Sequence, residues 1–353
     1  MSDRTLGIVG VGLIGGSVGM AARRAGWEVL GVDAPDVLEL ALGSGAIDRG
    51  ATLEQVRSAQ MVVLAAPVSR IAGLLADLMP TDALVTDVGS AKGAIVRAAA
   101  AAGIGLFVGG HPMAGSQLGG VANARADLFR GARYLLTPTA DTRPDAYARV
   151  SQFVREDLGA VPTAIDPDRH DLLVAAVSHL PHLLAVALLQ VTSGLSPEAL
   201  TVAGPSFRDL TRVGAANPEL WSDILAENAE AVHRVLAGFT EAMRRLEDDI
   251  TDPHAIERHF SEAGAAYAAL GGVIIERSGR NLEIAVPIEN RPGMLARVTT
   301  LMGSSDINIL DLHMEHTDTL HAALVLTIDS SAAARALGVL HDAGFPADPM
   351  ASE

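Results

Sequence analysis

Hydrophobic positions in the first part of the chain fall into short unbroken runs, separated by longer stretches that mix small, apolar and polar residues. These runs have the length and composition of buried strands. They lie at residues 6–9, 28–32, 61–65, 83–88 and 106–108. Segments of helical character fill the gaps, notably 69–78 and 91–101. Alternating strands and helices predict an α/β, Rossmann-like, doubly wound parallel sheet over residues 1–165.

The pattern changes after residue 165, where strand signals stop. The long apolar segment 172–189 predicts a buried helix that Pro181 kinks or interrupts. Stretches rich in Ala and Leu with one polar side, at 219–248 and 256–270, predict two more helices. We therefore expect an all-α substrate and dimerisation domain over residues 166–278. Its apolar helices exceed what one small domain buries, which favours a homodimer.

A third pattern follows the linker around residue 279. Apolar runs alternate with helical segments in the order strand, helix, strand, strand, helix, strand. The predicted strands are 282–288, 307–313, 322–328 and a weak one at 346–349. One predicted helix starts with the segment 290–295 and reaches about 302, and the other is 332–343. This βαββαβ order predicts a ferredoxin-like α+β domain over residues 279–353.

Composition narrows the function classes. The chain has 353 residues, enough for two or three domains, and a formal net charge of −16. That charge opposes general nucleic-acid binding, which depends on Lys and Arg. The chain has no cysteine, which excludes disulfides and thiolate metal sites. We see no signal peptide and no stretch with the apolar length of a membrane span, so we expect a cytoplasmic protein without a membrane partner.

A glycine motif, GVGLIG at residues 10–15, follows the first strand, and the second strand ends at Asp33. This order predicts a dinucleotide site, in which Gly10 makes the tight turn, Gly12 lets the backbone reach the pyrophosphate and Gly15 lets helix and strand pack closely. The Asp33 carboxylate accepts from ribose hydroxyls and would repel a 2′-phosphate, so we expect NAD rather than NADP. The predicted cofactor contacts are Gly10, Gly12, Leu13, Ile14, Gly15, Asp33, Ala66 and Pro67.

A histidine among glycines, His111 in the stretch 109–116, follows the apolar run 106–108. The glycines let the backbone turn and approach a ligand, and Pro112 disfavours a helix through the histidine. The carboxyl ends of strands in an α/β sheet bind ligands, and imidazole moves protons near pH 7. His111 is therefore a candidate acid–base residue, although a loop histidine that caps a carbonyl would look the same.

Ser90 and Lys92 follow the strand predicted at 83–88 and so lie at the same edge of the sheet as the glycine loop. They are candidates for contact with a ligand there. The alternative for Ser90 is that its hydroxyl caps the helix that begins beside it.

Two histidines three residues apart, His179 and His182, lie near one face of the predicted apolar helix. They could be core histidines, they could bind a metal with His111 and His170, or they could donate hydrogen bonds to an anionic substrate. The spacing is a poor metal signature and no well-placed carboxylate completes it, so we expect no metal.

Arg212 lies in a mostly apolar domain. A partly buried guanidinium needs an anion, and its planar fork suits a carboxylate. We predict that Arg212 binds an acidic substrate, and the alternative is an ion pair with Asp209 or Glu219.

Taken together, these motifs resemble the prephenate/arogenate dehydrogenase family over roughly residues 5–275. The segments that carry the resemblance are 10–17, 87–92, 109–116, 178–182 and 207–212. The resemblance implies NAD-dependent oxidative decarboxylation of prephenate to 4-hydroxyphenylpyruvate in tyrosine biosynthesis. Conversion of arogenate to tyrosine is the alternative. Another NAD-dependent β-hydroxyacid-type dehydrogenase and a non-catalytic NAD and amino-acid sensor are weaker alternatives, because neither needs all of these motifs.

The resemblance also implies roles for the candidate residues. His111 becomes the base that accepts the proton of the substrate hydroxyl, and Ser90 holds that hydroxyl or orients His111. Trp221 becomes an aromatic element near the site, or one contributed across a dimer interface. The implied substrate-binding residues are Arg212, His182, His179, Gln117, Trp221 and Lys92, with His182 favoured over His179 for direct contact.

One position bears on substrate choice. Gln117 is neutral where some relatives carry an acidic residue. An acidic side chain would attract the ammonium of arogenate, so a neutral Gln favours prephenate.

The C-terminal turn at residues 292–295 and the segment 306–309 resemble an ACT domain, a module that binds amino acids. Backbone N–H groups at a helix N-terminus suit a carboxylate. Feedback by tyrosine is the hypothesis, and a module kept only for oligomerisation is the alternative. The implied effector residues are Asn290, Arg291, Pro292, Gly293, Met294, Leu295 and Asn308.

Overall fold

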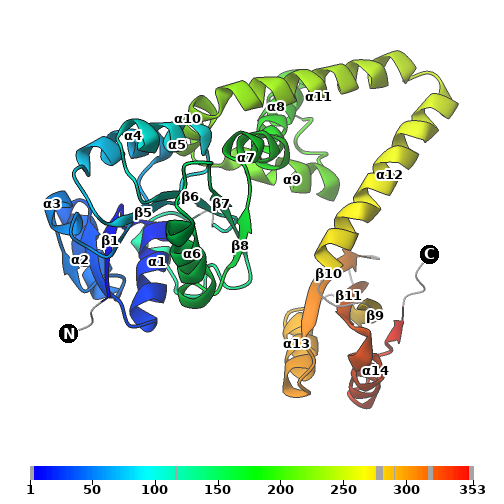
Figure 1. Cartoon of the computed structure of the whole chain (residues 1–353). Helices are drawn as coiled ribbons and strands as arrows, with labels where there is room; N and C mark the ends of the chain where they lie inside the picture. Colours follow the sequence, from blue (N-terminus) through cyan, green and yellow to red (C-terminus); the bar gives the residue numbers. More distant parts are fainter. Residues whose placement is uncertain are drawn as a thin grey trace. The chain divides into compact units, whose positions relative to one another are not determined.

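The computed structural model describes residues 4–115, 118–196, 198–275, 281–289, 291–316 and 321–349. The chain divides into two compact units, Met1–Met243 and Arg244–Glu353. The first holds the glycine loop and the candidate site residues up to Trp221, and the second holds the C-terminal sheet (Figure 1).

The first unit is built on an eight-stranded sheet with the order β3-β2-β1-β4-β5-β6-β7-β8. Its strands are β1 (Thr5–Val9), β2 (Glu28–Val32), β3 (Arg49–Gly50), β4 (Met61–Leu64), β5 (Leu84–Asp87), β6 (Phe107–Pro112), β7 (Arg133–Thr137) and β8 (Val161–Ala164). The strands β1 to β6 are parallel and follow the order of the dinucleotide-binding fold. The Rossmann-like prediction is therefore confirmed for this part of the sheet.

The prediction of a wholly parallel sheet is wrong at its far edge. The strand β7 runs antiparallel to β6, and β8 runs parallel to β7. The connection from β6 to β7 has only a short 3₁₀ turn, Val121–Asn123, among its described residues. A parallel pair needs a crossover connection, usually a helix, so without one the chain returns antiparallel.

Helices cover both faces of the sheet (Figure 1). They are α1 (Leu13–Arg24), α2 (Pro35–Gly43), α3 (Leu53–Val56), α4 (Val68–Asp77), α5 (Gly93–Ala101) and α6 (Pro144–Gln152). Alternate residues of a strand enter opposite cores, since Met61 and Val63 pack with α1 and α6 while Val62 and Leu64 pack with α4 and α5. This two-sided burial explains why the strands read as unbroken apolar runs.

The apolar segment after the sheet forms one continuous helical path. It comprises α7 (Pro167–Val174), a π-helical turn η3 (Ala175–His179) and α8 (Leu180–Leu195). Pro181 lies in the first turn of α8, directly after the π-helical turn, and the helical path continues through it. Of the α8 side chains only Ala185 is buried within this chain, so the predicted buried helix is instead largely exposed here.

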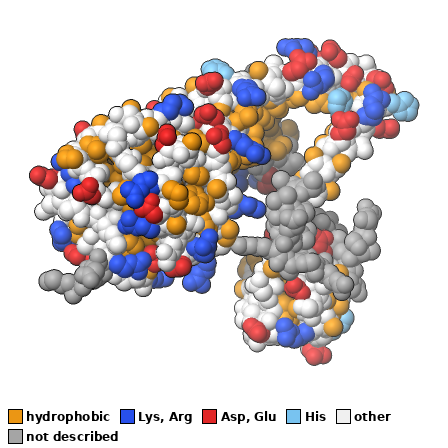
Figure 2. All heavy atoms as spheres, viewed as in Figure 1, with side chains coloured by type: hydrophobic (Ala, Val, Ile, Leu, Met, Phe, Trp, Pro, Cys, Tyr) orange, Lys and Arg blue, Asp and Glu red, His pale blue; other side chains and the backbone are white. Residues whose placement is uncertain are grey.

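This continuity also corrects the expectation about membrane spans. Because the helix runs through Pro181, Pro167–Leu195 reaches 29 residues with a mean hydropathy of 2.1 in its most apolar window. By length and composition it is long and apolar enough to cross a membrane, and 22% of that window is buried. Apolar side chains gather at the surface over α8 (Figure 2).

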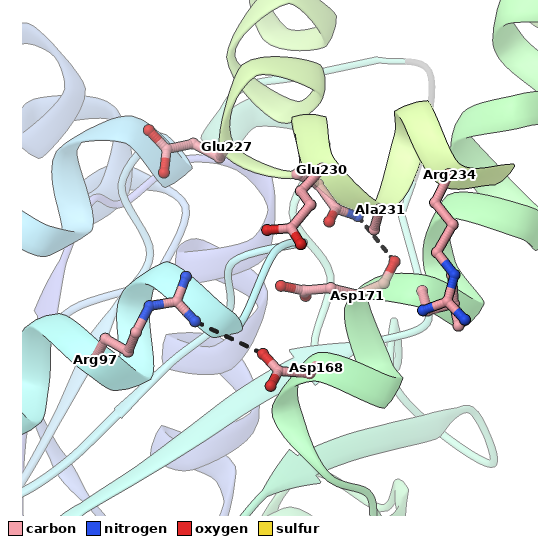
Figure 3. Close-up of a pocket in the computed structure, with 9 residues that line it drawn as sticks. Arg97, Asp168, Asp171, Glu227, Glu230, Ala231 and Arg234 are labelled. Atoms are coloured by element: carbon pink, nitrogen blue, oxygen red, sulfur yellow. Dashed lines mark hydrogen bonds and ion pairs between the residues drawn. The ribbon is translucent and has the colours of Figure 1, made fainter. Parts of the chain in front are cut away.

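The remaining helices of this region are α9 (Pro205–Thr211), a 3₁₀ turn η4 (Arg212–Ala215), α10 (Pro218–Glu227) and α11 (Ala229–Asp249). The single helix expected over 219–248 is thus two helices that meet at Asn228. Asn228 leaves the helical conformation, with φ −116° and ψ 25°, and its side chain bonds to other elements. A polar pocket of about 540 Å³ lies beside it, bordered by residues of α5, α7, α10 and α11 (Figure 3).

The second unit carries α12 (Pro253–Ile275) and a four-stranded antiparallel sheet. Its elements are β9 (Asn281–Glu289), α13 (Met294–Ser304), β10 (Ile309–His316), β11 (His321–Asp329), α14 (Ala333–Asp342) and β12 (Asp348–Pro349). The sheet order β10-β11-β9-β12 and the βαββαβ chain order give the ferredoxin-like topology. Buried residues such as Val286, Leu324 and Val298 form a separate core between this sheet and its helices.

Candidate active site

The glycine loop between β1 and α1 leaves an open space above the helix. Gly10 has φ +93°, and a Cβ there would lie 2.5 Å from the carbonyl oxygen of Ala65. A Cβ on Gly15 would lie 1.9 Å from the Gly10 oxygen, so both positions require glycine. A Cβ on Gly12 would meet nothing within 4 Å. The loop is therefore packed from behind and open at Gly12, which fits a bound pyrophosphate at the N-terminus of α1.

The other predicted cofactor residues lie around this loop. Asp33 follows β2, and its carboxylate accepts hydrogen bonds from the N–H groups of Val11 at 2.6 Å and Ala34 at 2.7 Å. Ala66 and Pro67 follow β4, and Leu13 and Ile14 open α1. The sheet thus brings together residues from the carboxyl ends of β1, β2 and β4, where such folds hold nucleotides.

The sequence suggested that His111 lies in a loop after the strand, but it lies within β6. The strand extends to Pro112 because residues 109–112 pair with β7. A Cβ on Gly109 would lie 2.4 Å from Thr137 Oγ1, and one on Gly110 would lie 2.6 Å from the Asp87 carbonyl. The two glycines therefore permit close packing against neighbouring strands, which corrects the expectation that they serve a turn and a ligand.

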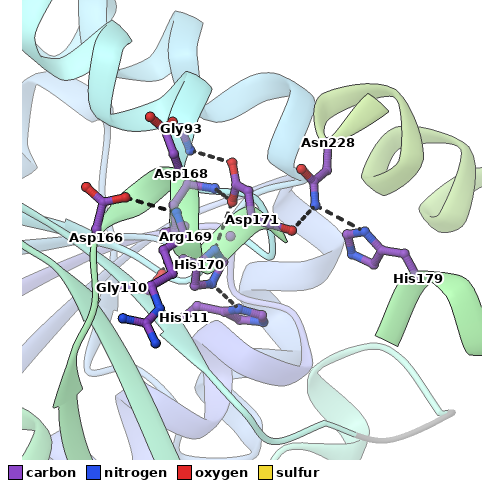
Figure 4. Close-up of polar contacts among 12 residues, drawn as sticks. Gly93, Gly110, His111, Asp166, Asp168, Arg169, His170, Asp171, His179 and Asn228 are labelled. Atoms are coloured by element: carbon purple, nitrogen blue, oxygen red, sulfur yellow. Dashed lines mark hydrogen bonds and ion pairs between the residues drawn. The ribbon is translucent and has the colours of Figure 1, made fainter. Parts of the chain in front are cut away.

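A chain of hydrogen bonds leads from His111 into the protein (Figure 4). His111 Nδ1 lies 2.9 Å from His170 Nε2, and His170 Nδ1 lies 2.8 Å from Asp171 Oδ1. The His170 side chain has no exposed surface. His111 is thus joined to an acidic group through a second, buried histidine.

Asp171 also caps the helix that follows β5. Its Oδ1 accepts from the Lys92 N–H at 2.7 Å and its Oδ2 accepts from the Gly93 N–H at 2.8 Å. The helix α5 begins at Gly93 with Lys92 as N-cap, so the cap reading of Ser90 is wrong. Ser90 is a half-buried residue of the loop between β5 and α5.

Lys92 does not have the substrate-facing position expected of it. Its side chain is fully buried, pairs with Asp87 and donates to the Gly110 carbonyl at 2.8 Å. Burial lowers the pKa of the Lys92 ammonium, and Asp87 opposes that shift. Because these partners occupy it, Lys92 joins β5 to β6 and leaves no surface for a substrate.

Asn228 extends the network to the other histidines. Its Nδ2 donates to the Asp171 carbonyl at 2.9 Å and lies 3.2 Å from His179 Nδ1. The Trp221 ring lies edge-on to His179, with centroids 5.8 Å apart. Trp221 stacks on His182 of the same chain, with centroids 3.7 Å apart and an interplanar angle of 26°. Trp221 thus lies against both histidines of the same chain.

His182, Arg212 and Trp221 line a common pocket of about 670 Å³. Gly115 and Ser178 also border it, which places the end of the His111 segment at its wall. His179 is not among the lining residues and is buried behind them. The two histidines therefore differ in their access to this pocket.

Arg212 is exposed, whereas a partly buried guanidinium was expected. It lies at the first position of η4. Among the described residues no ion pair joins it to Asp209 or Glu219. Its position on the pocket still lets it meet an anion.

Burial controls the charge of two histidines. Burial lowers the pKa of His111 well below its usual value, and the neighbouring His170, Lys92 and His179 add to this effect. Burial also lowers the pKa of His179 to about 4, against an opposing effect of Asp171. Both rings are neutral at pH 7, the state that a proton acceptor requires.

His170, Asp171 and Asn228 were missed as functional residues by sequence reasoning. His170 was weighed only as a metal ligand, but within the described ranges no group of three His, Asp or Glu could hold a metal. The adjacent His170 and Asp171 in the first turns of a helix were the available signal. Asn228 gave none, because its role depends on a helix break.

Of the described effector residues, those at 291–295 lie at the start of α13, and Asn308 lies just before β10. Gly293 is the N-cap and has φ +90°, and Arg291 pairs with Glu289 at 2.6 Å. Met294 is buried, while Pro292, Leu295 and Asn308 are exposed. Asn290, like the predicted substrate residue Gln117, lies outside the described residues.

Comparison with known protein families gives two matches. Residues 18–162 match the family described as prephenate dehydrogenase, nucleotide-binding domain. Residues 166–260 match the family described as prephenate dehydrogenase, dimerization domain. The two matches together cover more than half of the chain.

Individual relatives agree. The chain is 31% identical to prephenate dehydrogenase of Bacillus subtilis (strain 168), over 90% of this chain and 89% of that protein. A crystal structure of prephenate dehydrogenase from A. aeolicus in complex with hydroxyphenyl propionate and NAD+ has 33% identity and a TM-score of 0.71, and covers 76% of this chain and 99% of that chain. A crystal structure of Synechocystis arogenate dehydrogenase has 32% identity and a TM-score of 0.68, and covers 75% of this chain and 99% of that chain.

Proposed function

Because the chain belongs to the prephenate dehydrogenase family, we propose that it oxidises prephenate with NAD+ to give 4-hydroxyphenylpyruvate, CO₂ and NADH. The observation that carries this proposal is His111, a histidine held neutral by burial at the carboxyl end of a sheet strand. A neutral imidazole at the same edge of the sheet as a dinucleotide loop is suited to remove a proton from a hydroxyl group while a hydride leaves the same carbon.

His111 first removes a proton from the ring hydroxyl and later returns a proton to the same oxygen. It accepts the proton of the ring hydroxyl as hydride leaves that carbon. The dienone that results loses CO₂, and the electron pair of the broken C–C bond makes the ring aromatic. The phenolate oxygen then takes a proton back from His111, so the reaction consumes and releases no net proton. Aromatisation and CO₂ release make the step essentially irreversible, and the protein mainly has to align the reacting groups.

NAD+ supplies the hydride acceptor when it is bound. The open space at Gly12 admits its pyrophosphate, and the N-terminus of α1 favours that negative charge. Asp33 stands where a ribose would lie, and its carboxylate would have to give up the Val11 N–H or accept ribose hydroxyls on its remaining lone pairs. Its negative charge opposes the 2′-phosphate of NADP.

The pocket lined by His182, Arg212 and Trp221 is the site we assign to the substrate. Arg212 binds a substrate carboxylate with its guanidinium fork. His182 uses Nδ1 to bond the Ser178 carbonyl at 2.9 Å, which leaves Nε2 for the substrate. Ser90 holds the ring hydroxyl or orients His111.

The first experiment is initial NADH formation with prephenate and with arogenate. We expect turnover of prephenate. His111→Asn should lower kcat by at least about 100-fold, the low end for acid–base catalysis, with the Kd for NAD+ unchanged. His254→Asn is the matched control, because His254 is exposed on α12. No turnover of either substrate would refute the proposed function, and an unchanged kcat in His111→Asn would refute the role of His111.

We propose prephenate as the substrate, in preference to arogenate, because the side chain of Gln117 is neutral. Arogenate carries an ammonium where prephenate carries a keto oxygen, and a neutral amide offers it no attraction. Arogenate dehydrogenase of Synechocystis is about as similar to this chain as the A. aeolicus enzyme, so overall similarity does not separate the two substrates. Gln117→Glu should lower the ratio of kcat/KM for prephenate to that for arogenate, and an unchanged ratio would remove the argument.

We assign the C-terminal unit to regulation as an ACT-like domain that binds tyrosine. Its ferredoxin-like topology supports the resemblance, and the N-terminus of α13 at Gly293 offers N–H groups to a carboxylate. Tyrosine should then change the rate of NADH formation and raise the Tm of the C-terminal unit. A tyrosine titration that changes neither would refute this assignment, and regulation requires a measurable coupling between the two sites.

We also propose that the protein is a cytoplasmic homodimer joined through its helical region. Apolar side chains of α7, η3 and α8 are exposed in the single chain, and a second copy would cover them. They are Leu173, Val177, Val186, Leu188, Val191 and Leu195. Light scattering that gives the mass of one chain at micromolar concentration would refute the dimer. The functional division at 1–165, 166–278 and 279–353 remains a prediction.

A further inference from the structure

We propose that His170 and Asp171 are positioning residues that fix which nitrogen of His111 carries the proton and stabilise the charge that His111 gains. This inference rests on the proposed function, in which His111 is the base. Neither residue has to touch the substrate, because both act through His111 (Figure 4).

The hydrogen bonds allow one arrangement of protons when Asp171 is ionised and both rings are neutral. A carboxylate only accepts, so His170 Nδ1 must donate to Asp171 Oδ1. Neutral His170 then has a lone pair on Nε2, which accepts from His111 Nδ1. His111 is left with an unprotonated Nε2, the form that can take a proton from the substrate. The opposite arrangement would need a protonated Asp171.

Asp171 is built to stay ionised. Burial alone would raise its pKa, but the hydrogen bonds from His170 and from the N–H groups of Lys92 and Gly93 outweigh that effect and lower it. Those N–H groups form the N-terminus of α5, where a negative charge is favoured. Asn228 fixes the main chain of Asp171 from the opposite side. The carboxylate is therefore held by His170 and by the N-terminus of α5, while Asn228 holds the main chain of the same residue.

The outer side of Asp171 faces the polar pocket of Figure 3. Its side chain is 12% exposed, whereas that of His170 has no exposed surface. Arg97 and Arg234 also line this pocket, together with the acidic residues Asp168, Glu227 and Glu230. The hydrogen-bonded series thus runs from the half-buried His111 through the buried His170 to the Asp171 carboxylate, which borders a pocket lined by both acidic and basic side chains.

This hydrogen-bonded arrangement stabilises the positive charge that His111 gains when it accepts a proton. When His111 accepts a proton it becomes a cation in a buried site, which burial disfavours. Its Nδ1–H then points at His170 Nε2, and the Asp171 carboxylate stabilises the positive charge through the second ring. The other charged or titratable groups close to these rings are Lys92, Asp87 and His179. Lys92 pairs with Asp87, and Asp171 is the carboxylate that hydrogen-bonds to the two rings through His170.

Two variants separate positioning from simple packing. Gln at position 170 places Oε1 near the site of His170 Nε2, so it still accepts from His111 Nδ1. Phe fills the space but accepts nothing. With prephenate, we expect His170→Phe to lower kcat by about 10- to 100-fold, the usual effect of losing such a supporting partner. His170→Gln should recover part of that loss. KM and the Kd for NAD+ should stay within about two-fold in both, because neither variant touches those sites.

The proton position is measured without any substrate. Nitrogen NMR on ¹⁵N-histidine-labelled protein, with the His111 signals assigned from the His111→Asn spectrum, should show the proton on His111 Nδ1 in the parent and in His170→Gln. His170→Phe should shift the ring toward a mixture of the two tautomers.

The outcomes are distinct. A proton on His111 Nε2 in the parent, or equal loss of kcat in the Phe and Gln variants, would overturn the inference. A kcat of His170→Phe equal to that of the parent would also overturn it. A parent that turns over neither prephenate nor arogenate would refute the proposed function, while the NMR result would still decide the proton arrangement. If His170→Phe fails to fold, the parent and His170→Gln spectra decide it alone.

Discussion

Lys92 and Asp87 form an ion pair in which neither side chain has any exposed surface. Both also hold Gly110, the residue before His111. Lys92 donates to the Gly110 carbonyl at 2.8 Å, and Asp87 accepts from the Gly110 N–H at 3.1 Å. A buried pair on one strand and the following helix thus fixes the neighbouring strand at the point where His111 begins.

Removal of Lys92 from this ion pair should lower the stability of the protein. Lys92→Met leaves the Asp87 carboxylate buried without its counter-charge, and we expect the free energy of unfolding to fall by about 3–5 kcal/mol. Urea unfolding measures it. Arg97→Met is the matched control, since Arg97 is a 72% exposed cation on the same helix, 3.6 Å from Asp168, and should change stability by less than about 1 kcal/mol. Equal effects of the two changes would contradict this account.

The glycine loop offers a pair of variants with opposite consequences. Gly12→Ala adds a methyl group where the protein has no neighbour, so stability should change by less than about 0.5 kcal/mol. The same methyl group occupies the space assigned to the pyrophosphate, and the Kd for NADH should rise at least about 10-fold, the equivalent of 1.4 kcal/mol. Fluorescence titration with NADH and thermal unfolding measure the two effects.

Gly15→Ala, in contrast, should lower the stability of the fold. Its Cβ would lie 1.9 Å from the Gly10 carbonyl oxygen, which is backbone and cannot move aside, so the fold itself should be destabilised by several kcal/mol. If Gly12→Ala lowered the Tm as much as Gly15→Ala, the assignment of the open space to the cofactor would be wrong.

Arg212 should act on substrate binding more than on chemistry. A hydrogen bond to a charged group contributes about 1.5–3 kcal/mol, so Arg212→Gln should raise KM for prephenate by roughly 10- to 150-fold. We expect kcat to change only a few-fold, because the reacting carbon lies at the other end of the substrate. Arg208→Gln is the control, because Arg208 is exposed on α9 and does not line the pocket. A kcat loss without a change in KM would assign Arg212 to another step.

Local pattern was enough to predict the dinucleotide half of the fold. The strands β1, β2, β4 and β5 are buried on both faces, so each leaves an unbroken apolar run that sequence reveals. The βαββαβ order of the second unit was predicted in the same way. The edge strands β7 and β8 were not, because their direction depends on whether a helix crosses over between β6 and β7, and that connection gives no local signal.

The site was predicted only as far as its residues carry recognisable chemistry. His111, His182 and Arg212 stand out in the sequence, whereas Lys92 was placed wrongly because its burial depends on Asp87 beneath it. The hydrogen-bonded series through His170 could not be inferred, since β6 and α7 meet only in three dimensions. Asn228 acts because the chain breaks between α10 and α11, and a run of helix formers on both sides conceals that break.

Stability should fall as the pH is lowered toward 4, because of buried histidine. Burial lowers the pKa of His179 from its usual 6.5 to about 4, so between these values the unfolded chain binds a proton that the folded protein does not. Stability therefore rises with pH in this window, is complete above about pH 6.5, and is lost as the pH falls toward 4. His111, whose pKa is also lowered, acts in the same direction. We expect His179 to account for about 1–3 kcal/mol between pH 7 and pH 4.5.

A single substitution isolates this contribution. In His179→Asn the side-chain oxygen replaces Nδ1 as acceptor for Asn228, so the bond is kept while the titrating group is removed. Urea unfolding at pH 7 should then differ little from the parent, and the loss on going to pH 4.5 should be smaller in the variant. His254→Asn, at an exposed position, should follow the parent at every pH. If His179→Asn lost as much stability as the parent at pH 4.5, His179 would not be held neutral by burial.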